Sequence, residues 1–118
     1  MSIARNKYCY FSVYQPPSFT LTPEPVQISL GKVVSLACKA EGWPVPEIMW
    51  YFGDGLLLLD DQHVAVEQQV EGALCASTLS LKNVRPARHA GKYTMEATNR
   101  CGNVKQTVVV SGERHNVS

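Results

Sequence analysis

The chain has 118 residues, 45% of them hydrophobic, and a formal net charge of +1. This length suits one domain with its own core, and the composition excludes wholesale disorder. A charge so near zero, with no long run of either sign, gives no basis for binding nucleic acid or an anionic membrane surface. The leucine run at residues 56–59, like every other apolar run of the chain, is far too short to cross a bilayer, so membrane insertion is not expected.

We expect three segments along the chain. Residues 1–16 form an N-terminal arm or linker, which is rich in aromatic side chains and lacks the continuous apolar centre of a signal peptide. Residues 17–111 form a single domain, and residues 112–118 form a C-terminal tail.

Short alternating segments fill the domain from end to end. The predicted strands cover residues 19–22, 26–30, 33–40, 47–52, 56–59, 63–70, 74–81, 91–99 and 103–110. Pro23-Glu24-Pro25 interrupts the first two, and such a break indicates a strand that stops and switches sheets. Residues 82–90 form a longer corner, and no window has helical periodicity. Strands spaced in this way predict an all-β, two-sheet antiparallel sandwich.

The most regular alternation lies in residues 91–99. Tyr93, Met95 and Ala97 share one face, which suits a strand with that face on a core. A tyrosine just after a corner, two positions before the central inward residue, is the tyrosine-corner pattern. Cys38 and Trp50 precede it with the spacing of an immunoglobulin sandwich.

Two stretches carry a resemblance to immunoglobulin domains of the I-set type. PPSFTLTPEPVQISLGKVVSLACKAEGWPVPEIMWYFGDG resembles the front half of such domains, and STLSLKNVRPARHAGKYTMEATNRCGN resembles the back half. The resemblance implies a signature core made of Cys38, Trp50, Leu79, Tyr93 and Met95.

The chain departs from the family pattern at two places. His89 and Ala90 stand where Asp and Ser are common, which implies a corner that is less well tied. Met95 stands where the second cysteine of the inter-sheet disulfide belongs, so Cys38 lacks its usual partner. Losing that bridge forgoes roughly 2–5 kcal/mol in a secreted domain, whereas a cytosolic domain never had it available.

The missing bridge therefore favours the intracellular branch of the family, the modules of titin, twitchin and obscurin. That resemblance implies a non-catalytic structural and protein-binding module of a muscle or cytoskeletal scaffold. Its partners would be adjacent modules and filament proteins, with weak self-association possible, and it would need no cofactor.

The alternative is an extracellular adhesion or receptor domain with a non-standard disulfide between Cys75 and Cys101. These two cysteines are expected on different sheets, whereas a disulfide needs Cα atoms within about 7 Å. Counting thiols separates the two hypotheses, because four thiols indicate the cytosol and two indicate the outside.

Catalysis is not expected. His63, His89 and His115 are scattered over a strand, a corner and the tail, and Asp60-Asp61 is a turn pair that suits solvent better than a metal. A third hypothesis is a redox-sensitive or metal-binding domain, which would need an acidic thiol at Cys101 in an exposed hairpin beside Arg100.

Three surfaces are candidates for binding a protein partner. One is the leucine segment, in which Leu56 and Leu58 would be exposed near a sheet edge. The second is the loop end that carries Trp43, Arg100 and Cys101. The third is the last strand, whose edge at residues 107–110 could accept another strand.

Overall fold

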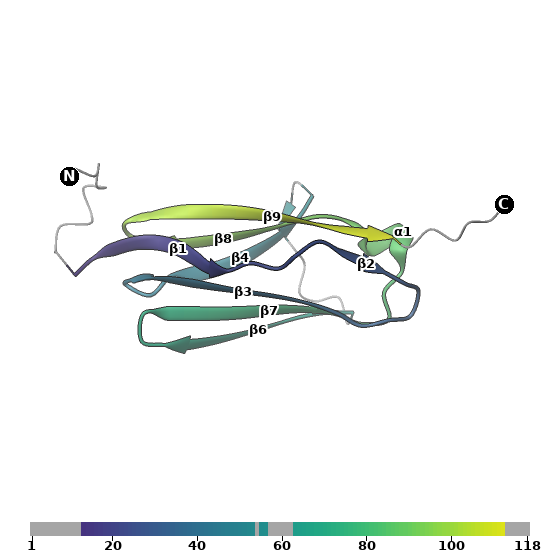
Figure 1. Ribbon diagram of the computed structural model, residues 1–118, viewed down its shortest axis with the longest axis horizontal. Coiled ribbons are helices and arrows are strands. Elements are labelled where there is room, and N and C mark those ends of the chain that lie inside the picture. The colour runs from purple at the N-terminus through teal and green to yellow at the C-terminus, as the bar shows by residue number, and fades with distance from the viewer. Residues whose placement is uncertain (1–12, 54, 57–62, 113–118) are drawn as a thin grey trace.

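A computed structural model describes residues 13–53, 55–56 and 63–112. Two sheets face each other, as the sequence predicts, with strand orders β1-β3-β7-β6 and β2-β9-β8-β4-β5 (Figure 1). The elements are β1 (Gln15–Leu21), β2 (Val26–Ile28), β3 (Val34–Trp43), β4 (Glu47–Phe52), β5 (Gly55–Leu56), β6 (Val64–Glu71), β7 (Leu74–Leu81), α1 (Pro86–His89), β8 (Gly91–Asn99) and β9 (Gly102–Gly112).

The chain changes sheets between β1 and β2, as the proline break predicts. β1 pairs antiparallel with β3 in the four-stranded sheet, and β2 pairs parallel with β9 in the five-stranded sheet. The β2–β9 pairing joins Val26 to Val110, so the prediction of an open edge at residues 107–110 is wrong at Val110. Another strand cannot pair there because β2 already does.

Two strand ends lie outside their predicted bounds. β1 begins at Gln15, ahead of the predicted residue 19, because an edge strand can hold prolines whose missing N–H groups the sheet does not need. β3 runs on to Trp43 instead of ending at residue 40, because Trp43 pairs with Gln15 across the two strands. The added residues at the start of β1 and at the end of β3 thus pair with each other.

The strands with the most regular alternation have their predicted bounds. β4, β7 and β8 begin and end as expected, and in β7 every second side chain is buried. Of the leucine segment, β5 contains the backbone of Leu56, and residues 57–59 lie outside the described residues.

The core lies between the sheets and contains the whole predicted signature. Its buried residues are Ile28, Leu36, Cys38, Ala40, Ile48, Trp50, Val64, Cys75, Leu79, Leu81, Val84, Tyr93, Met95, Ala97, Val108 and Val110. Met95 lies directly opposite Trp50 in the β4–β8 pair, and both are almost fully buried. A thioether therefore fills the place of the second cysteine beside the indole, where soft sulfur and an aromatic ring pack well.

The corner before β8 is well tied, which corrects the expectation drawn from His89. The ring Nδ1 of His89 accepts a 2.8 Å hydrogen bond from the backbone N–H of Arg85, at the start of α1. The hydroxyl of Tyr93 donates a 2.6 Å hydrogen bond to the backbone carbonyl of His89. An imidazole nitrogen thus satisfies the backbone N–H of Arg85, and the two hydrogen bonds together tie the corner to α1 and to β8.

Gly91, the first residue of β8, lies close against the ring of Phe52. Its φ is +152°, and a Cβ there would lie 2.8 Å from Cε1 of Phe52. The Phe52 ring in turn packs on Tyr93, with ring centroids 4.7 Å apart. Only glycine fits this position without displacing an aromatic ring of the core.

Candidate functional site

The loop end of the sandwich brings together segments that are far apart in the sequence. The start of β1, the end of β3 and the β8–β9 hairpin meet there (Figure 1). The side-chain N–H groups of Asn99 donate hydrogen bonds of 2.8 Å to the carbonyls of Gln15 and Pro44. One amide thus fixes the hairpin to both neighbouring segments.

Two of the predicted binding residues are displayed on this loop end. Trp43 is 43% exposed, although it is the terminal residue of β3. Arg100 is exposed at the tip of the hairpin, where its Nη1 donates a 3.1 Å hydrogen bond to the hydroxyl of Tyr14. The guanidinium carbon also lies 5.5 Å from the centre of the Tyr14 ring, within the range of a cation–π contact.

Cys101 does not have the exposure predicted for it. It is only 8% exposed, and its backbone N–H donates a 2.8 Å hydrogen bond to Oδ1 of Asn99. The side chain of Asn99 therefore holds the turn of the hairpin in a conformation in which the Cys101 side chain is buried. Cys101 contributes little surface of its own to the loop end, and an exposed reactive thiol is not found there.

The cysteines of the core are unpaired thiols. Cys38 and Cys75 are both free and buried, so the Cys75–Cys101 bridge of the extracellular alternative is not formed. No disulfide joins two cysteines within the described part of the chain. Burial, with a smaller contribution from Cys75, raises the pKa of Cys38 to about 12, and burial likewise raises the pKa of Cys75. Both thiols stay protonated, which makes them poor nucleophiles and poor metal ligands.

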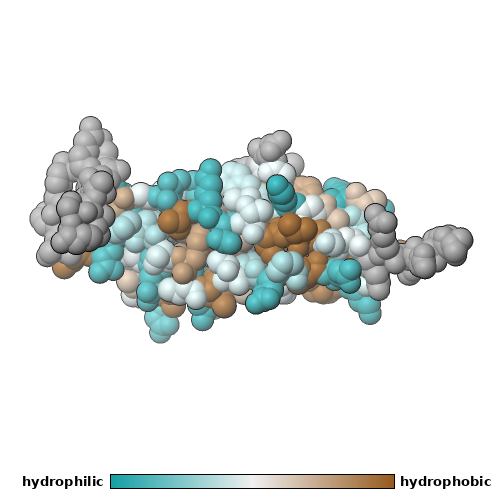
Figure 2. All heavy atoms as spheres, turned by 45° about the horizontal axis from the view of Figure 1, so that its top comes forward, coloured by the Kyte–Doolittle hydropathy of each residue, from teal (hydrophilic) through white to brown (hydrophobic). Residues whose placement is uncertain are grey.

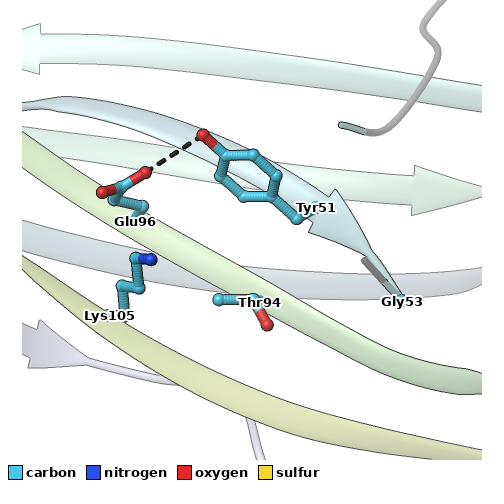
Figure 3. A pocket seen from close by; sticks show the side chains of 5 residues that line it. All are labelled: Tyr51, Gly53, Thr94, Glu96 and Lys105. Atoms are coloured by element: carbon cyan, nitrogen blue, oxygen red, sulfur yellow. Dashed lines mark hydrogen bonds between the residues drawn. The ribbon is translucent and has the colours of Figure 1, made fainter. Parts of the chain in front are cut away.

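A second surface was not predicted. A hollow of about 260 Å³ lies on the outer face of the five-stranded sheet, lined by Tyr51, Gly53, Thr94, Glu96 and Lys105 (Figure 3). Its polar groups come from three adjacent strands, β4, β8 and β9. The lining is open and polar, which suits contact with a protein surface better than enclosure of an apolar small molecule.

Glu96 is the electrostatic centre of this hollow. One carboxylate oxygen accepts a 3.0 Å hydrogen bond from the hydroxyl of Tyr51, and the other accepts one from the side-chain N–H of Asn103. Hydrogen bonding from Asn103 and then from Tyr51 lowers the pKa of Glu96, with help from the charge of Lys105. The Glu96 hydrogen bond raises the pKa of Tyr51. A carboxylate held ionised and saturated in this way can position charge, but it is badly suited to take up a proton.

The sequence pattern indicates which residues face outward at the hollow, but it does not show that they lie side by side. Alternation places Thr94 and Glu96 on the solvent face of β8. On β4 it places Tyr51 on the outer face, because its neighbour Trp50 points inward. That Tyr51 pairs with Thr94, and Glu96 with Lys105, is set by strand register. The register between β4 and β8, which are far apart in the sequence, cannot be read from alternation alone.

The other predicted features have the following outcomes. Leu58 lies outside the described residues, and the structure describes only the backbone of Leu56. In the described ranges, no group of three or more His, Cys, Asp or Glu side chains could hold a metal ion. None of the described helices is both long and apolar enough to cross a membrane.

The face in Figure 2 shows polar and apolar residues mixed together, with the largest apolar group in the half of the molecule toward α1. Large exposed apolar residues include Leu30 and Val33, at 70% and 64% exposure, in the turn between β2 and β3. Apolar surface of this size is common on single domains and does not by itself mark an interface.

Two muscle proteins are among the relatives of this chain. It is 35% identical over 95 residues to the smooth-muscle myosin light chain kinase of Gallus gallus, covering 80% of this chain and 5% of that protein. It is 36% identical over 89 residues to the muscle M-line assembly protein unc-89 of Caenorhabditis elegans, covering 75% of this chain and 1% of that protein. The chain thus spans a small fraction of the length of these relatives.

The solved structures give the same fold. A crystal structure of titin M10 in complex with an obscurin-like 1 immunoglobulin domain contains a chain that superposes with a TM-score of 0.72 at 27% identity, covering 84% of this chain and 95% of that one. The sequence profile of the immunoglobulin I-set domain matches residues 17–111. Taken with the buried Cys38–Trp50–Met95 core and the tyrosine corner, this match shows that the chain belongs to the immunoglobulin I-set family.

Proposed function

We propose that this domain is a non-catalytic structural and protein-binding module of an intracellular muscle or cytoskeletal scaffold protein. The observation that carries the proposal is the unbridged core, in which Cys38 is a free buried thiol and Met95 occupies the place of its partner. A fold that holds its two sheets together without this bridge suits a compartment where thiols stay reduced. The resemblance to two muscle proteins supports the same location.

The partners in this proposal are other proteins, with a second immunoglobulin domain as the favoured class. One neighbouring structure is a complex between two immunoglobulin domains, which supports this choice. The loop end carries an exposed Trp43 and a cationic Arg100 held in place by Tyr14, and aromatic and arginine side chains dominate binding energy at protein interfaces. Leu56 and Leu58 remain candidates for the same role, and weak self-association remains part of the proposal.

The electrostatics support a binding role without catalysis. The one hollow described above contains a carboxylate whose pKa is lowered and a tyrosine whose pKa is raised, so neither group is prepared to exchange a proton near pH 7. The buried thiols of Cys38 and Cys75 are protonated as well, so they are poor nucleophiles. Binding and mechanical continuity are the functions that these groups can serve.

Localisation of the full-length gene product tests the proposal. An antibody raised against the domain should label filaments or sarcomeres in permeabilised cells and should leave intact cells unlabelled. Labelling of intact cells at the surface would contradict it. The binding surface is tested separately, by comparing co-sedimentation of the domain with a filament fraction for Trp43→Ala, Arg100→Ala and the control Val33→Ala. Loss with the first two and retention with the third is the expected result.

A second candidate function has its own supporting observation. Cys101 is disulfide-bonded, and disulfides persist mainly in oxidising compartments. This observation favours an extracellular adhesion or receptor domain, in which the bridge lies outside the core. Surface labelling of intact cells is the outcome that would select this candidate.

A further inference from the structure

The hollow on the five-stranded sheet carries two opposite charges that are only loosely coupled to each other. Glu96 on β8 and Lys105 on β9 lie directly opposite in the strand register, and both side chains line the hollow (Figure 3). Three groups lower the pKa of Glu96, and the charge of Lys105 has the smallest effect of the three. The hydrogen bonds from Asn103 and Tyr51 have the larger effects. The ammonium of Lys105 can therefore pair with a group outside its own chain.

Glu96 is the fixed member of this pair of charges. Its two carboxylate oxygens accept hydrogen bonds from Tyr51 and Asn103, which hold the negative charge in one place. Lys105 is exposed, and its flexible four-carbon stem carries the ammonium away from the sheet. An ion pair loses less side-chain entropy when one of its partners is already held in place. Glu96 is thus suited to capture an ammonium group from another molecule.

The register of β8 and β9 makes this face complementary to a second copy of itself. Its outward-facing residues form cross-strand pairs, namely Lys92–Val109, Thr94–Thr107 and Glu96–Lys105. A two-fold axis that runs along the strands, midway between β8 and β9, lays β8 of each copy over β9 of the other. Every one of these pairs is then repeated between the copies. Glu96 meets Lys105 twice, and among these pairs no like charges meet.

The hollow gives the lysine of a second copy room to enter. Sheets packed face to face lie about 10 Å apart, a gap that side chains from both sheets fill. The hollow of about 260 Å³ leaves additional space beside Glu96 for the stem of an incoming Lys105. Two strands from each copy make a small contact, which belongs to the weak, transient interfaces that bury less than about 1,200 Å².

We propose that two copies of this domain associate face to face through the outer side of β8 and β9, with Lys105 of each copy entering the hollow of the other and pairing with Glu96. The contact deepens the proposed function, on which it rests, by placing the weak self-association on one surface. It leaves Trp43 and Arg100 free for a different protein, because they lie at the loop end and not on this face. One copy can then hold a second copy and a filament protein together.

Sedimentation velocity on the purified 118-residue chain tests the surface. The wild type should form reversible dimers at protein concentrations up to about 1 mM. Lys105→Glu brings two carboxylates together in each contact and should weaken the dimer at least about tenfold. The control Lys39→Glu makes the same charge change on β3, in the other sheet, and should associate like the wild type. A monomeric wild type, or Lys105→Glu dimers as tight as those of the wild type, would overturn the inference.

A mixture of two variants distinguishes reciprocal pairing from other modes of association. Glu96→Lys alone and Lys105→Glu alone should each be monomeric where the wild type dimerises. An equal mixture of the two should dimerise, because every lysine of one variant then meets a glutamate of the other. Thermal melts show which variants are folded, and Lys105→Glu, which changes only an exposed side chain, keeps the test decisive if Glu96→Lys does not fold. Folded variants that stay monomeric when mixed would rule out the reciprocal pairing.

Co-sedimentation with the filament fraction separates this contact from the proposed function. Lys105→Glu should still bind that fraction, because the loop end is unchanged. A wild-type chain that co-sediments but never dimerises would overturn the contact alone. A chain that dimerises through this face and labels the surface of intact cells would contradict the proposed intracellular function alone.

Discussion

The indole N–H of Trp50 donates a 2.8 Å hydrogen bond to the hydroxyl of Ser77, and the bond is buried. Trp50 belongs to β4 in the five-stranded sheet, and Ser77 belongs to β7 in the four-stranded sheet. Ser77 lies opposite Cys38 in the β3–β7 pair. A directed polar contact thus joins the two layers next to the cysteine that an inter-sheet disulfide would have used.

Trp50 and Ser77 therefore contribute a hydrogen bond between the two sheets in addition to the apolar packing of the core. Trp50→Ala should lower the free energy of unfolding by about 3–5 kcal/mol, because a large buried aromatic is removed and a cavity is left. Ser77→Ala should cost about 1–3 kcal/mol, because the indole N–H is left buried without an acceptor. Urea unfolding measures both, with Ser80→Ala on the outer side of β7 as the control. Wild-type stability in Trp50→Ala would show that the core is built around other residues.

Restoring a cysteine at position 95 should allow the missing bridge to form. Met95 and Cys38 are buried in the same core and lie on opposite sheets. Oxidised Met95→Cys should be more stable than its reduced form by about 2–4 kcal/mol. The reduced form should be less stable than the wild type, because a smaller side chain leaves space beside Trp50.

Thermal melts with and without reductant measure the two states of this variant. The control is Met95→Cys combined with Cys38→Ser, which can form no such bond and should melt at one temperature in both conditions. Identical melts for the single variant would mean that the two side chains do not meet across the layers.

Gly91→Ala should destabilise the domain by about 1–3 kcal/mol, through the unfavourable φ and the contact with the Phe52 ring. Gly55→Ala is a matched control, because its added Cβ would meet nothing within 4 Å and its φ is not in the positive range. Chemical unfolding of both variants checks the prediction, which fails if the two behave alike.

The Glu96 cluster predicts a dependence of stability on pH. The folded-state pKa of Glu96 lies below its ordinary value of 4.5, so folding favours the ionised form. Its contribution to stability is therefore fully present above that ordinary value and is lost as the pH falls through the lower, folded-state pKa. The stability difference between wild type and Glu96→Gln should thus be larger at pH 7 than at pH 3.

Asn103→Ala provides an independent check on the cause of that shift. It removes the donor with the largest effect on Glu96, so an NMR titration should show the pKa of Glu96 moving back up toward its ordinary value. An unchanged pKa would mean that another group holds the carboxylate ionised.

Alternation predicts elements well where one strand face is buried along its whole length. β7 and β8 were predicted to the residue for this reason, because each step of two places another side chain in the core. The tyrosine corner followed from spacing, and the unbridged Cys38 was implied by the resemblance to the I-set family. These features are local, or depend on a pattern that repeats within a single strand.

What could not be predicted depends on which segments meet in space. The extra length of β1 and β3 comes from the pairing of Gln15 with Trp43, and the burial of Cys101 comes from contacts with Asn99. The hydrogen bond that His89 accepts from Arg85 depends on the rotation of one imidazole ring toward that backbone N–H. A sequence pattern identifies these residues but does not give the distances between them.

The parallel pairing of β2 with β9 determines how the domain would respond to tension. β1 begins at one end of the sandwich and β9 finishes at the other (Figure 1), so a pull applied through the flanking chain acts along its long direction. The β2–β9 hydrogen bonds lie across that direction. They would be loaded together in shear and would not break one after another. Resistance to stretching would then rest on the β1–β3 pair, through which the pull enters, together with the three residue pairs between β2 and β9.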